Sequence, residues 1–557
     1  MEQQRILLYV ALSLVGLMLY NQWIMDYRTP EPVVTETTTV TNADGTTTVV
    51  EAPADLPAAA AGNAAAATAT ATSTEARSIS VTTDIIDVQI STQGGTITHV
   101  QLIDYPVSIK DSETPFSLMS SDPAHFLVAE SGLQSRKGVK APTHREIMTS
   151  VQESYTMGES DTLDVPLTWE ADGITVTKTL TFTRGSYEVV VNYDIQNTSD
   201  TDWVANQYRQ LKRKPGTKDE KQQFLNTYIG AVVSTEEDRY SKVSFGDIED
   251  ENLDIDVTNG WVAMIQHYFA SAWLPLPDET NKAYTLYLQN ENRYVVGMVS
   301  GSQTIPAGSQ GNFSTKAYIG PKIQEKLSAA APHLELTVDY GWLTILAQPL
   351  FWVLKTLHGY LGNWGWAIIG TTFLIKAVFY KLSEAGYRSM ARMKKLQPKL
   401  QSLKERHGDD RAKMGQATME LYKKEKVNPL GSCFPMLVQI PVFIALYWVL
   451  LESVELRQAP WLGWIKDLSI RDPFFILPFI MAATMYIQQK LNPAPVDPIQ
   501  AKVFQFLPLV FGIFFAFFPA GLVLYWVVNN TLSIMQQYYI TRLVLGDTPE
   551  KSKKATP

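Results

Sequence analysis

The sequence predicts a polytopic α-helical membrane protein that also carries a large all-β domain. Three observations lead to this fold class. Apolar runs toward the carboxyl terminus approach the roughly 20 residues that a helix needs to cross a bilayer. Residues 78–330 instead alternate apolar and polar side chains with the period of two that is typical of strands. Acidic residues dominate before residue 330, whereas Lys and Arg crowd residues 387–426, which indicates parts on opposite sides of a membrane.

The amino-terminal part predicts an anchor followed by a tether. Residues 1–27 contain an apolar run, and Tyr20 and Trp23 occupy places where a cleavage site needs small residues. This favours an uncleaved transmembrane signal anchor over a cleaved signal peptide. Residues 28–77 are rich in Thr and Ala and show no sustained amphipathic period, so we expect a disordered tether.

Residues 78–330 predict one antiparallel β-sandwich domain. Residues 174–182 and 187–195 alternate strictly, and the turn residues 184–186 separate them. Trp261 and Trp273 are interpreted mainly as core residues, and stacking against carbohydrate is the alternative.

An amphipathic stretch connects this domain to the first core span. Residues 331–362 predict an interfacial helix and connector, with the helical pattern broken at Pro349. Residues 363–383 then predict a transmembrane helix with one cation, Lys376, well inside it. A lysine at the centre of a membrane helix costs about 2.5–3.5 kcal/mol, so it needs a partner, water or a route to the surface. Two interpretations stay open: a lysine that snorkels to the interface, or a charge held in a wet cavity.

Residues 384–427 predict a basic helical hairpin. They contain twelve Lys or Arg and six Asp or Glu, a net charge of +6, and the helical pattern breaks at residues 407–410. The positive-inside rule places this hairpin in the cytoplasm. The β-domain is then periplasmic, and both the amino terminus and the tail, residues 546–557, are cytoplasmic.

Residues 428–545 predict four further transmembrane helices and their loops. The apolar runs cover residues 431–451, 473–491, 504–518 and 522–543. The third run is too short for an upright helix in an average bilayer, which indicates local thinning or an incomplete span.

The sequence offers little for enzyme chemistry. Cys433 is the only cysteine, the seven histidines are scattered, and no phosphate-binding or dinucleotide motif occurs. We therefore expect no catalytic residues, no metal, no cofactor and no specific binding of DNA.

The remaining chemical signal is a set of polar residues inside the apolar runs. Individually they are interpreted as contacts between helices, and collectively as the lining of an aqueous pocket open to one side. The set comprises Thr371, Thr372, Lys376, Gln439, Gln488, Gln489, Asn529 and Asn530.

Four segments resemble one family over nearly the whole chain outside the tether. They are GWVAMIQHYFASAWLP (residues 260–275), KVNPLGSCFPMLVQIPVFIALYWVL (residues 426–450), SVELRQAPWLGWIKDLSIRDPFFILP (residues 453–478) and FPAGLVLYWVVNN (residues 518–530). They are similar to the YidC-type membrane protein insertases of bacterial inner membranes. The resemblance implies a five-helix core with a hydrophilic groove open to the cytoplasm, and a periplasmic super-sandwich domain.

The resemblance also implies site residues. Lys376 occupies the place of a groove cation that is usually Arg, Thr372 matches a groove Thr, and Trp526 matches a position that often carries Tyr. Lysine keeps the charge but loses the bidentate geometry of arginine. We expect Gln439 and Gln489 in the same groove.

The predicted function is insertion and folding of inner-membrane proteins, alone or with the Sec translocon. Partners would be nascent membrane proteins, Sec components, the ribosome and targeting machinery, and the lipid bilayer. Arg388, Arg392, Lys394 and Lys395 of the hairpin are the expected docking residues, and the alternative is that they only set topology. The alternative functions are a small-solute transporter with a sugar-binding periplasmic domain and, less favoured, an intramembrane Ser–Lys protease, for which no serine is convincingly placed.

Overall fold

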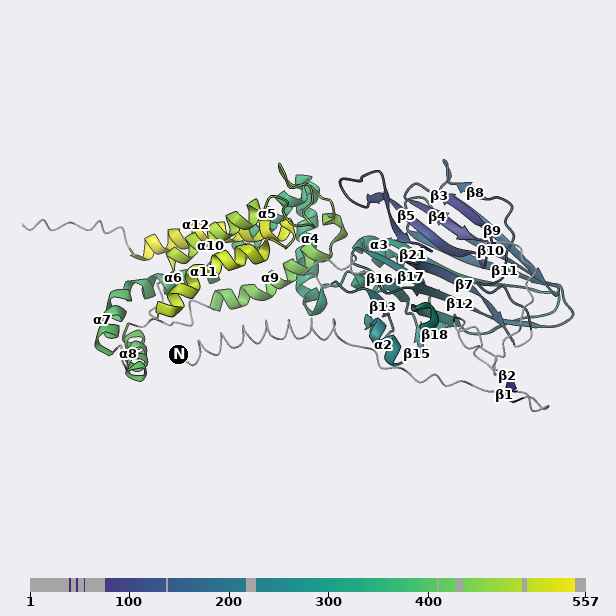
Figure 1. Cartoon of the computed structure of the whole chain (residues 1–557), viewed down its shortest axis with the longest axis horizontal. Helices are drawn as coiled ribbons and strands as arrows, with labels where there is room; N and C mark the ends of the chain where they lie inside the picture. The colour runs from purple at the N-terminus through teal and green to yellow at the C-terminus, as the bar shows by residue number, and fades with distance from the viewer. Residues whose placement is uncertain are drawn as a thin grey trace, which may run out of the picture.

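The computed structural model describes residues 40–41, 47–48, 55, 76–136, 139–216, 227–407, 410–425, 427, 434–492 and 498–545. The predicted anchor and tail lie outside these residues, as does most of the predicted tether. Within the tether region, β1 (Val40–Thr41) pairs antiparallel with β2 (Thr47–Thr48). The β-domain and the helical part lie at opposite ends of an elongated molecule (Figure 1).

Two large sheets form the β-domain. In spatial order, the eight-stranded sheet consists of β14 (Ser241–Val243), β13 (Gly230–Val233), β16 (Val262–Ile265), β17 (Phe269–Leu274), β21 (Gln310–Pro321), β11 (Glu188–Asn197), β10 (Ile174–Thr183) and β9 (Thr162–Ala171). The path of the eleven-stranded sheet runs through β15 (Asp254–Thr258), β18 (Thr280–Leu288), β19 (Arg293–Ser300), β12 (Trp203–Arg213), β7 (Leu127–Ser135), β5 (Thr96–Pro106), β4 (Ile86–Ser91), β3 (Ser78–Thr82) and β8 (Ser154–Thr156). Off this path, β6 (Pro115–Met119) pairs with β5, and β20 (Gln303–Ile305) pairs with β12.

The strands form where the alternation predicts them. Every second residue of β10 is buried, because successive side chains of a strand point to opposite faces. The two sheets face each other: the Ser131 hydroxyl of β7 lies 2.8 Å from the Tyr193 hydroxyl of β11. The pairing is antiparallel as expected, except that β8 runs parallel to β3.

Short helices lead from the β-domain to the helical part. These connecting helices are α3 (Gln324–Ala330) and the 3₁₀ turns η3 (Leu334–Thr337) and η4 (Gly341–Leu343). Two further short elements, α2 (Phe245–Asp250) and the 3₁₀ turn η2 (Gln289–Glu291), lie between strands of the β-domain. Helix α4 (Thr344–Leu361) continues through Pro349, so the break expected at this proline is wrong. Pro349 is the sixth residue of α4, and the helix continues although this residue cannot donate the intrahelical hydrogen bond to Ile345.

The helix that carries Lys376 is shorter than predicted. Helix α5 (Trp364–Val378) ends next to Phe379, and α6 (Tyr380–Lys395) continues at an angle of 68°. The basic segment contains more than the two expected helices, because α6 ends at Lys395 and is followed by α7 (Gln397–His407) and α8 (Arg411–Lys424).

Four helices complete this part of the protein. They are α9 (Phe434–Glu452), α10 (Ile476–Leu491), α11 (Pro498–Phe515) and α12 (Ala520–Leu545), with the 3₁₀ turn η6 (Val454–Leu456) after α9. Among the described residues, none of the helices taken singly has both the length and the apolarity to cross a bilayer. The bent pair α5 and α6 meets that criterion when taken together.

The two parts meet at a polar junction. Lys322, which follows β21, faces Glu452 of α9 at 3.8 Å, and both side chains are almost fully buried. His267 Nε2 donates to the carbonyl oxygen of Leu451 at 2.9 Å. The Arg457 guanidinium donates to the carbonyl oxygen of Pro106 at 2.7 Å. The end of α9 and the loop after it are therefore fixed to the β-domain by specific contacts.

Candidate functional site

Lys376 is a buried cation of the helical part. Its residue is 9% exposed, and its Nζ donates to the Ser533 hydroxyl of α12 at 2.7 Å. Within the part of the chain that the structure describes, no carboxylate lies within ion-pair distance of Nζ. Lys376 also stands three residues before the bend at Phe379. The snorkelling interpretation therefore does not describe this lysine, which bonds to a neighbouring helix.

Ser533 belongs to a polar face of α12. Its hydroxyl donates to the carbonyl oxygen of Asn529 at 2.7 Å. Asn530, Ser533 and Gln537 are all nearly buried and recur at the spacing of one helical face. Helix α12 packs against α5, α6 and α10, which brings this polar face between them.

Both threonines of α5 are buried, and Thr372 lies on the same side of the helix as Lys376. Thr372 is one turn earlier, is fully buried, and donates to the carbonyl oxygen of Ile368 at 2.7 Å. Thr371 is also fully buried, and its hydroxyl has no hydrogen-bond partner among the described residues. An unbonded buried hydroxyl costs free energy, so this position favours occupation by a polar group.

The two predicted glutamines lie in different places. Gln439 of α9 donates through Nε2 to the Ser383 hydroxyl of α6 at 3.2 Å. The Oε1 atom of Gln489, on α10, is buried without a partner in the described part of the protein. The Oε1 atom of Gln537, on α12, is also buried without a partner among the described residues, whereas its Nε2 donates to the Oδ1 atom of Asn492 at 2.8 Å.

Trp526 stands at the aromatic end of the polar face of α12. Its ring packs edge-on against Phe443 at 5.0 Å and Phe515 at 5.6 Å, measured between centroids. Its Nε1 is buried and lacks an acceptor among the described residues. Trp526 thus closes the polar face with an apolar ring and one available donor.

The basic residues chosen for docking differ in their surroundings. Arg388 donates to Glu384 at 2.9 and 2.6 Å within α6, and Lys394 Nζ lies 3.5 Å from the carbonyl oxygen of Leu491. Arg392 and Lys395 are exposed. The helical segment that carries all four residues lies at the end of the molecule far from the β-domain (Figure 1).

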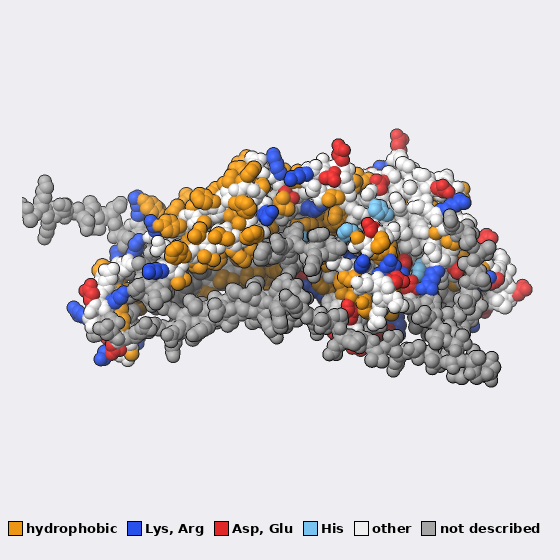
Figure 2. Space-filling model, in the orientation of Figure 1, with side chains coloured by type: hydrophobic (Ala, Val, Ile, Leu, Met, Phe, Trp, Pro, Cys, Tyr) orange, Lys and Arg blue, Asp and Glu red, His pale blue; other side chains and the backbone are white. Residues whose placement is uncertain are grey.

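Large apolar side chains cover much of the surface of the helical part (Figure 2). Trp352 is 68% exposed, Phe479 75%, Phe506 60% and Ile513 61%. An exposed apolar surface of this extent marks a membrane or a protein partner. The polar contacts around Lys376 therefore lie inside an apolar shell.

The structure corrects the expectation that no serine lies near Lys376, and it adds residues to the candidate site. Ser533 is within hydrogen-bond distance of Lys376, although no serine was expected there. Its hydroxyl already donates to Asn529 and lies inside a helix, whose backbone N–H groups are used and cannot stabilise an oxyanion. The sequence did not point to Ser533 or Ser383. For Ser533, the helical face formed by residues 526, 530, 533 and 537 was the available signal.

Comparison with known proteins gives consistent results for both halves. The family described as "YidC periplasmic domain" matches residues 78–353, and the family described as "60Kd inner membrane protein" matches residues 356–547. The membrane protein insertase YidC of Nitrosococcus oceani is 48% identical over 547 residues, covering 98% of this chain and 99% of the relative. The membrane protein insertase YidC of Methylococcus capsulatus is 51% identical over 473 residues, covering 84% of this chain and 86% of the relative.

A solved structure is described as "Active YidC insertase crystal structure with the first transmembrane domain resolved". The match covers 83% of this chain and 92% of the chain in that structure. Its TM-score is 0.38 and its sequence identity is 17%. The sequence relatives extend over nearly all of both chains, and they support the insertase prediction rather than the transporter or protease alternatives. The chain belongs to the YidC family of membrane protein insertases and is an inner-membrane protein with a periplasmic β-domain.

Proposed function

We propose that this insertase guides the hydrophilic segment of a nascent membrane protein along the polar residues between α5, α9, α10 and α12, while the apolar segment leaves into lipid. The observation that carries the proposal is the hydrogen bond of Lys376 to Ser533. A hydroxyl does not neutralise an ammonium, so the site keeps a net positive charge inside an apolar shell. A carboxylate of the substrate would gain a favourable interaction there.

Unsatisfied polar atoms support the same route. Thr371, Gln489, Trp526 and Gln537 each hold a buried donor or acceptor without a partner among the described residues. A polar substrate backbone could bond to these atoms and so avoid the cost of unpaired groups in hydrocarbon. Trp526 and Thr372 would bound the route, and Gln439 would face it from α9.

The orientation follows from charge. The hairpin of α6, α7 and α8 is cytoplasmic by the positive-inside rule, and so are both termini. Arg388, Arg392, Lys394 and Lys395 would receive the substrate from the ribosome and targeting machinery. The family resemblance supports Sec translocon components as further partners.

Reconstitution in liposomes tests the proposal. A stalled single-span substrate would be presented to protein carrying a photo-crosslinking residue at Trp526 or Gln439, with Phe506 and Phe479 as lipid-exposed controls. We expect protease protection of the outer tail, together with crosslinks from the first two positions only. Insertion with crosslinks only from the control positions would contradict the route. Solute counterflow without insertion would contradict the function.

A further inference from the structure

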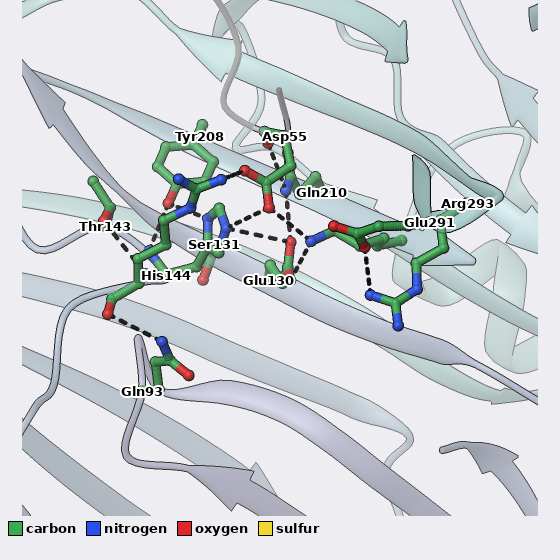
Figure 3. Close-up of polar contacts among 12 residues, drawn as sticks. Asp55, Gln93, Glu130, Ser131, Thr143, His144, Tyr208, Gln210, Glu291 and Arg293 are labelled. Atoms are coloured by element: carbon green, nitrogen blue, oxygen red, sulfur yellow. Dashed lines mark hydrogen bonds and ion pairs between the residues drawn. The ribbon is translucent and has the colours of Figure 1, made fainter. Parts of the chain in front are cut away.

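A second buried polar cluster lies in the β-domain, far from Lys376. Its members come from β7, from β12 and from the segment between β7 and β8 (Figure 3). Ser131 of β7 faces the other sheet, so its neighbour Glu130 points to the opposite side of the eleven-stranded sheet. On that side Glu130, His144 and Lys212 surround Asp55, which comes from the amino-terminal segment before β3.

Asp55 is bound by both its side chain and its backbone. The carboxylate accepts from Lys212 Nζ at 2.9 Å, from His144 Nε2 at 3.2 Å and from the Arg145 guanidinium. Its backbone carbonyl oxygen accepts from Gln210 Nε2 at 3.1 Å. Recognition of a carboxylate together with the adjacent main chain fits an aspartyl residue of a peptide better than a free anion.

The cluster is balanced in charge only when Asp55 is present. Lys212 Nζ lies 3.0 Å from the Glu130 carboxylate, and the Arg145 guanidinium pairs with Asp55. The cluster therefore contains two cations, Lys212 and Arg145, and two carboxylates, Asp55 and Glu130. The residues Asp55, Glu130 and Lys212 are between 5% and 8% exposed. Burial alone would raise the pKa of Asp55, but the hydrogen bond from His144 and the charge of Lys212 lower it below its ordinary value. Without Asp55, Lys212 keeps Glu130 as its counter-charge, and the half-exposed Arg145 leaves one excess positive charge at the site.

Other contacts hold the binding groups in place. The Tyr208 hydroxyl accepts from the backbone N–H of His144 at 2.7 Å and lies 2.8 Å from Nδ1. If the Tyr208 hydroxyl donates to Nδ1, the ring can donate from Nε2 to Asp55. Gln210 is held by the Tyr284 hydroxyl at 2.6 Å and by Glu130 at 2.6 Å. The donors are thus oriented by hydrogen bonds to neighbouring side chains, as expected of a built site.

We propose that this cluster is a binding site for an aspartyl residue of a peptide, and that Asp55 of the chain's own amino-terminal segment is its resident ligand. The segment before β3 is then attached to the outer face of the eleven-stranded sheet at Asp55, in addition to its covalent connection at β3.

Spin labelling of the full-length protein in lipid nanodiscs tests the attachment. The label would be placed at Ala54→Cys in a Cys433→Ser background. We expect a motionally restricted spectrum in this background and a mobile one after Lys212→Met. The control Lys214→Met, which removes a partly exposed lysine two residues further on that donates to the carbonyl oxygen of Pro123, should leave the label restricted. A label that is equally mobile in all three proteins would overturn the proposal, and thermal unfolding would verify that each variant is folded.

Peptide binding tests the chemistry without relying on a destabilised variant. A fluorescent peptide of residues 50–60, VEAPADLPAAA, would be titrated into wild-type protein and into Asp55→Ala. We expect at least about tenfold tighter binding to Asp55→Ala, because the wild-type site is occupied. A peptide with Asn in place of its Asp should bind at least about tenfold more weakly to the same variant. Equal binding by the two proteins, or by the two peptides, would overturn the proposal.

Discussion

Lys376 Nζ donates a hydrogen bond to Ser533 Oγ across 2.7 Å and joins α5 to α12 through a hydroxyl instead of a carboxylate. A carboxylate partner would have stabilised the cation and neutralised it. The hydroxyl orients the ammonium and leaves its charge available. This difference can be tested by comparing variants that remove the charge of Lys376 with a variant that removes only the hydrogen bond to Ser533.

Changing the charge of Lys376 should affect substrates with acidic outer tails. We expect Lys376→Arg to be nearly silent, and Lys376→Ala or Lys376→Glu to reduce insertion about tenfold, equivalent to about 1.4 kcal/mol. Ser533→Ala, which keeps the charge, is the matched control and should lose less activity. Protease protection of acidic-tailed and neutral-tailed substrates provides the measurement. Wild-type insertion of the acidic-tailed substrate by Lys376→Glu would exclude an electrostatic role.

Neutralising the basic residues of α6 should weaken ribosome binding. Replacing Arg388, Arg392, Lys394 and Lys395 with Gln removes four charges that can bind RNA phosphates, so binding should fall and depend less on salt. Co-sedimentation at two salt concentrations measures this, with membrane topology checked separately.

A matched variant distinguishes position from total charge. Replacing Lys399, Lys413, Lys423 and Lys424 with Gln removes the same charge from α7 and α8. We expect a smaller loss of binding from this variant. Unchanged binding in the α6 variant, with correct topology, would leave its basic residues a role in orientation only.

Breaking the junction ion pair should destabilise the contact between the β-domain and the helices. Glu452→Leu leaves Lys322 buried without a counter-charge, which should cost about 3–5 kcal/mol. The double variant Lys322→Met with Glu452→Leu should recover most of that loss. Glu325→Leu, which breaks the more exposed pair with Lys355, is the control and should cost less than about 1 kcal/mol. Pulse proteolysis in denaturant reports each value, and a double variant no more stable than Glu452→Leu would refute the explanation.

The same junction should weaken in acid through His267. Burial, together with the charge of Lys322, lowers the pKa of His267 from 6.5 to about 3. Between these values the unfolded chain binds a proton that the folded protein does not, so stability falls as the pH falls, by up to about 1.4 kcal/mol per pH unit. Below about pH 3 both states are protonated and this dependence ends.

His267→Gln tests this dependence, because glutamine can keep a donor for Leu451 and does not titrate. Denaturant midpoints at pH 7.5 and 5.0 should differ less in His267→Gln than in the wild type. Equal differences would show that other groups cause the acid sensitivity.

The sequence predicted local structure better than pairing. The alternation in β10 and β11 identified both strands, because burial on one face is a local pattern. The order of the sheets and the parallel pairing of β8 with β3 depend on distant residues, so no local pattern indicates them. The bend at Phe379 was also missed, because the apolar pattern continues across it.

The candidate site was predicted only in part, because its contacts also join residues that are distant in the sequence. Lys376 was evident as a charge in an apolar run, but its partner Ser533 is a common helix residue in another segment. Its spacing from Trp526 and Gln537 was the only local sign of a shared face. Asp55 gave no sign at all, because the residues bonded to it lie 89 residues or more further along the chain.

The junction pair also affects the order of assembly. Glu452 follows Lys322 by 452 − 322 = 130 residues, so at about 5–20 residues per second it is synthesised roughly 6–26 s later. All strands of the β-domain precede Lys322 in the chain, whereas Leu451, Glu452 and Arg457 follow it. A newly made β-domain therefore waits with Lys322 unpaired, and its attachment to the helices is a late event in the biogenesis of the insertase itself.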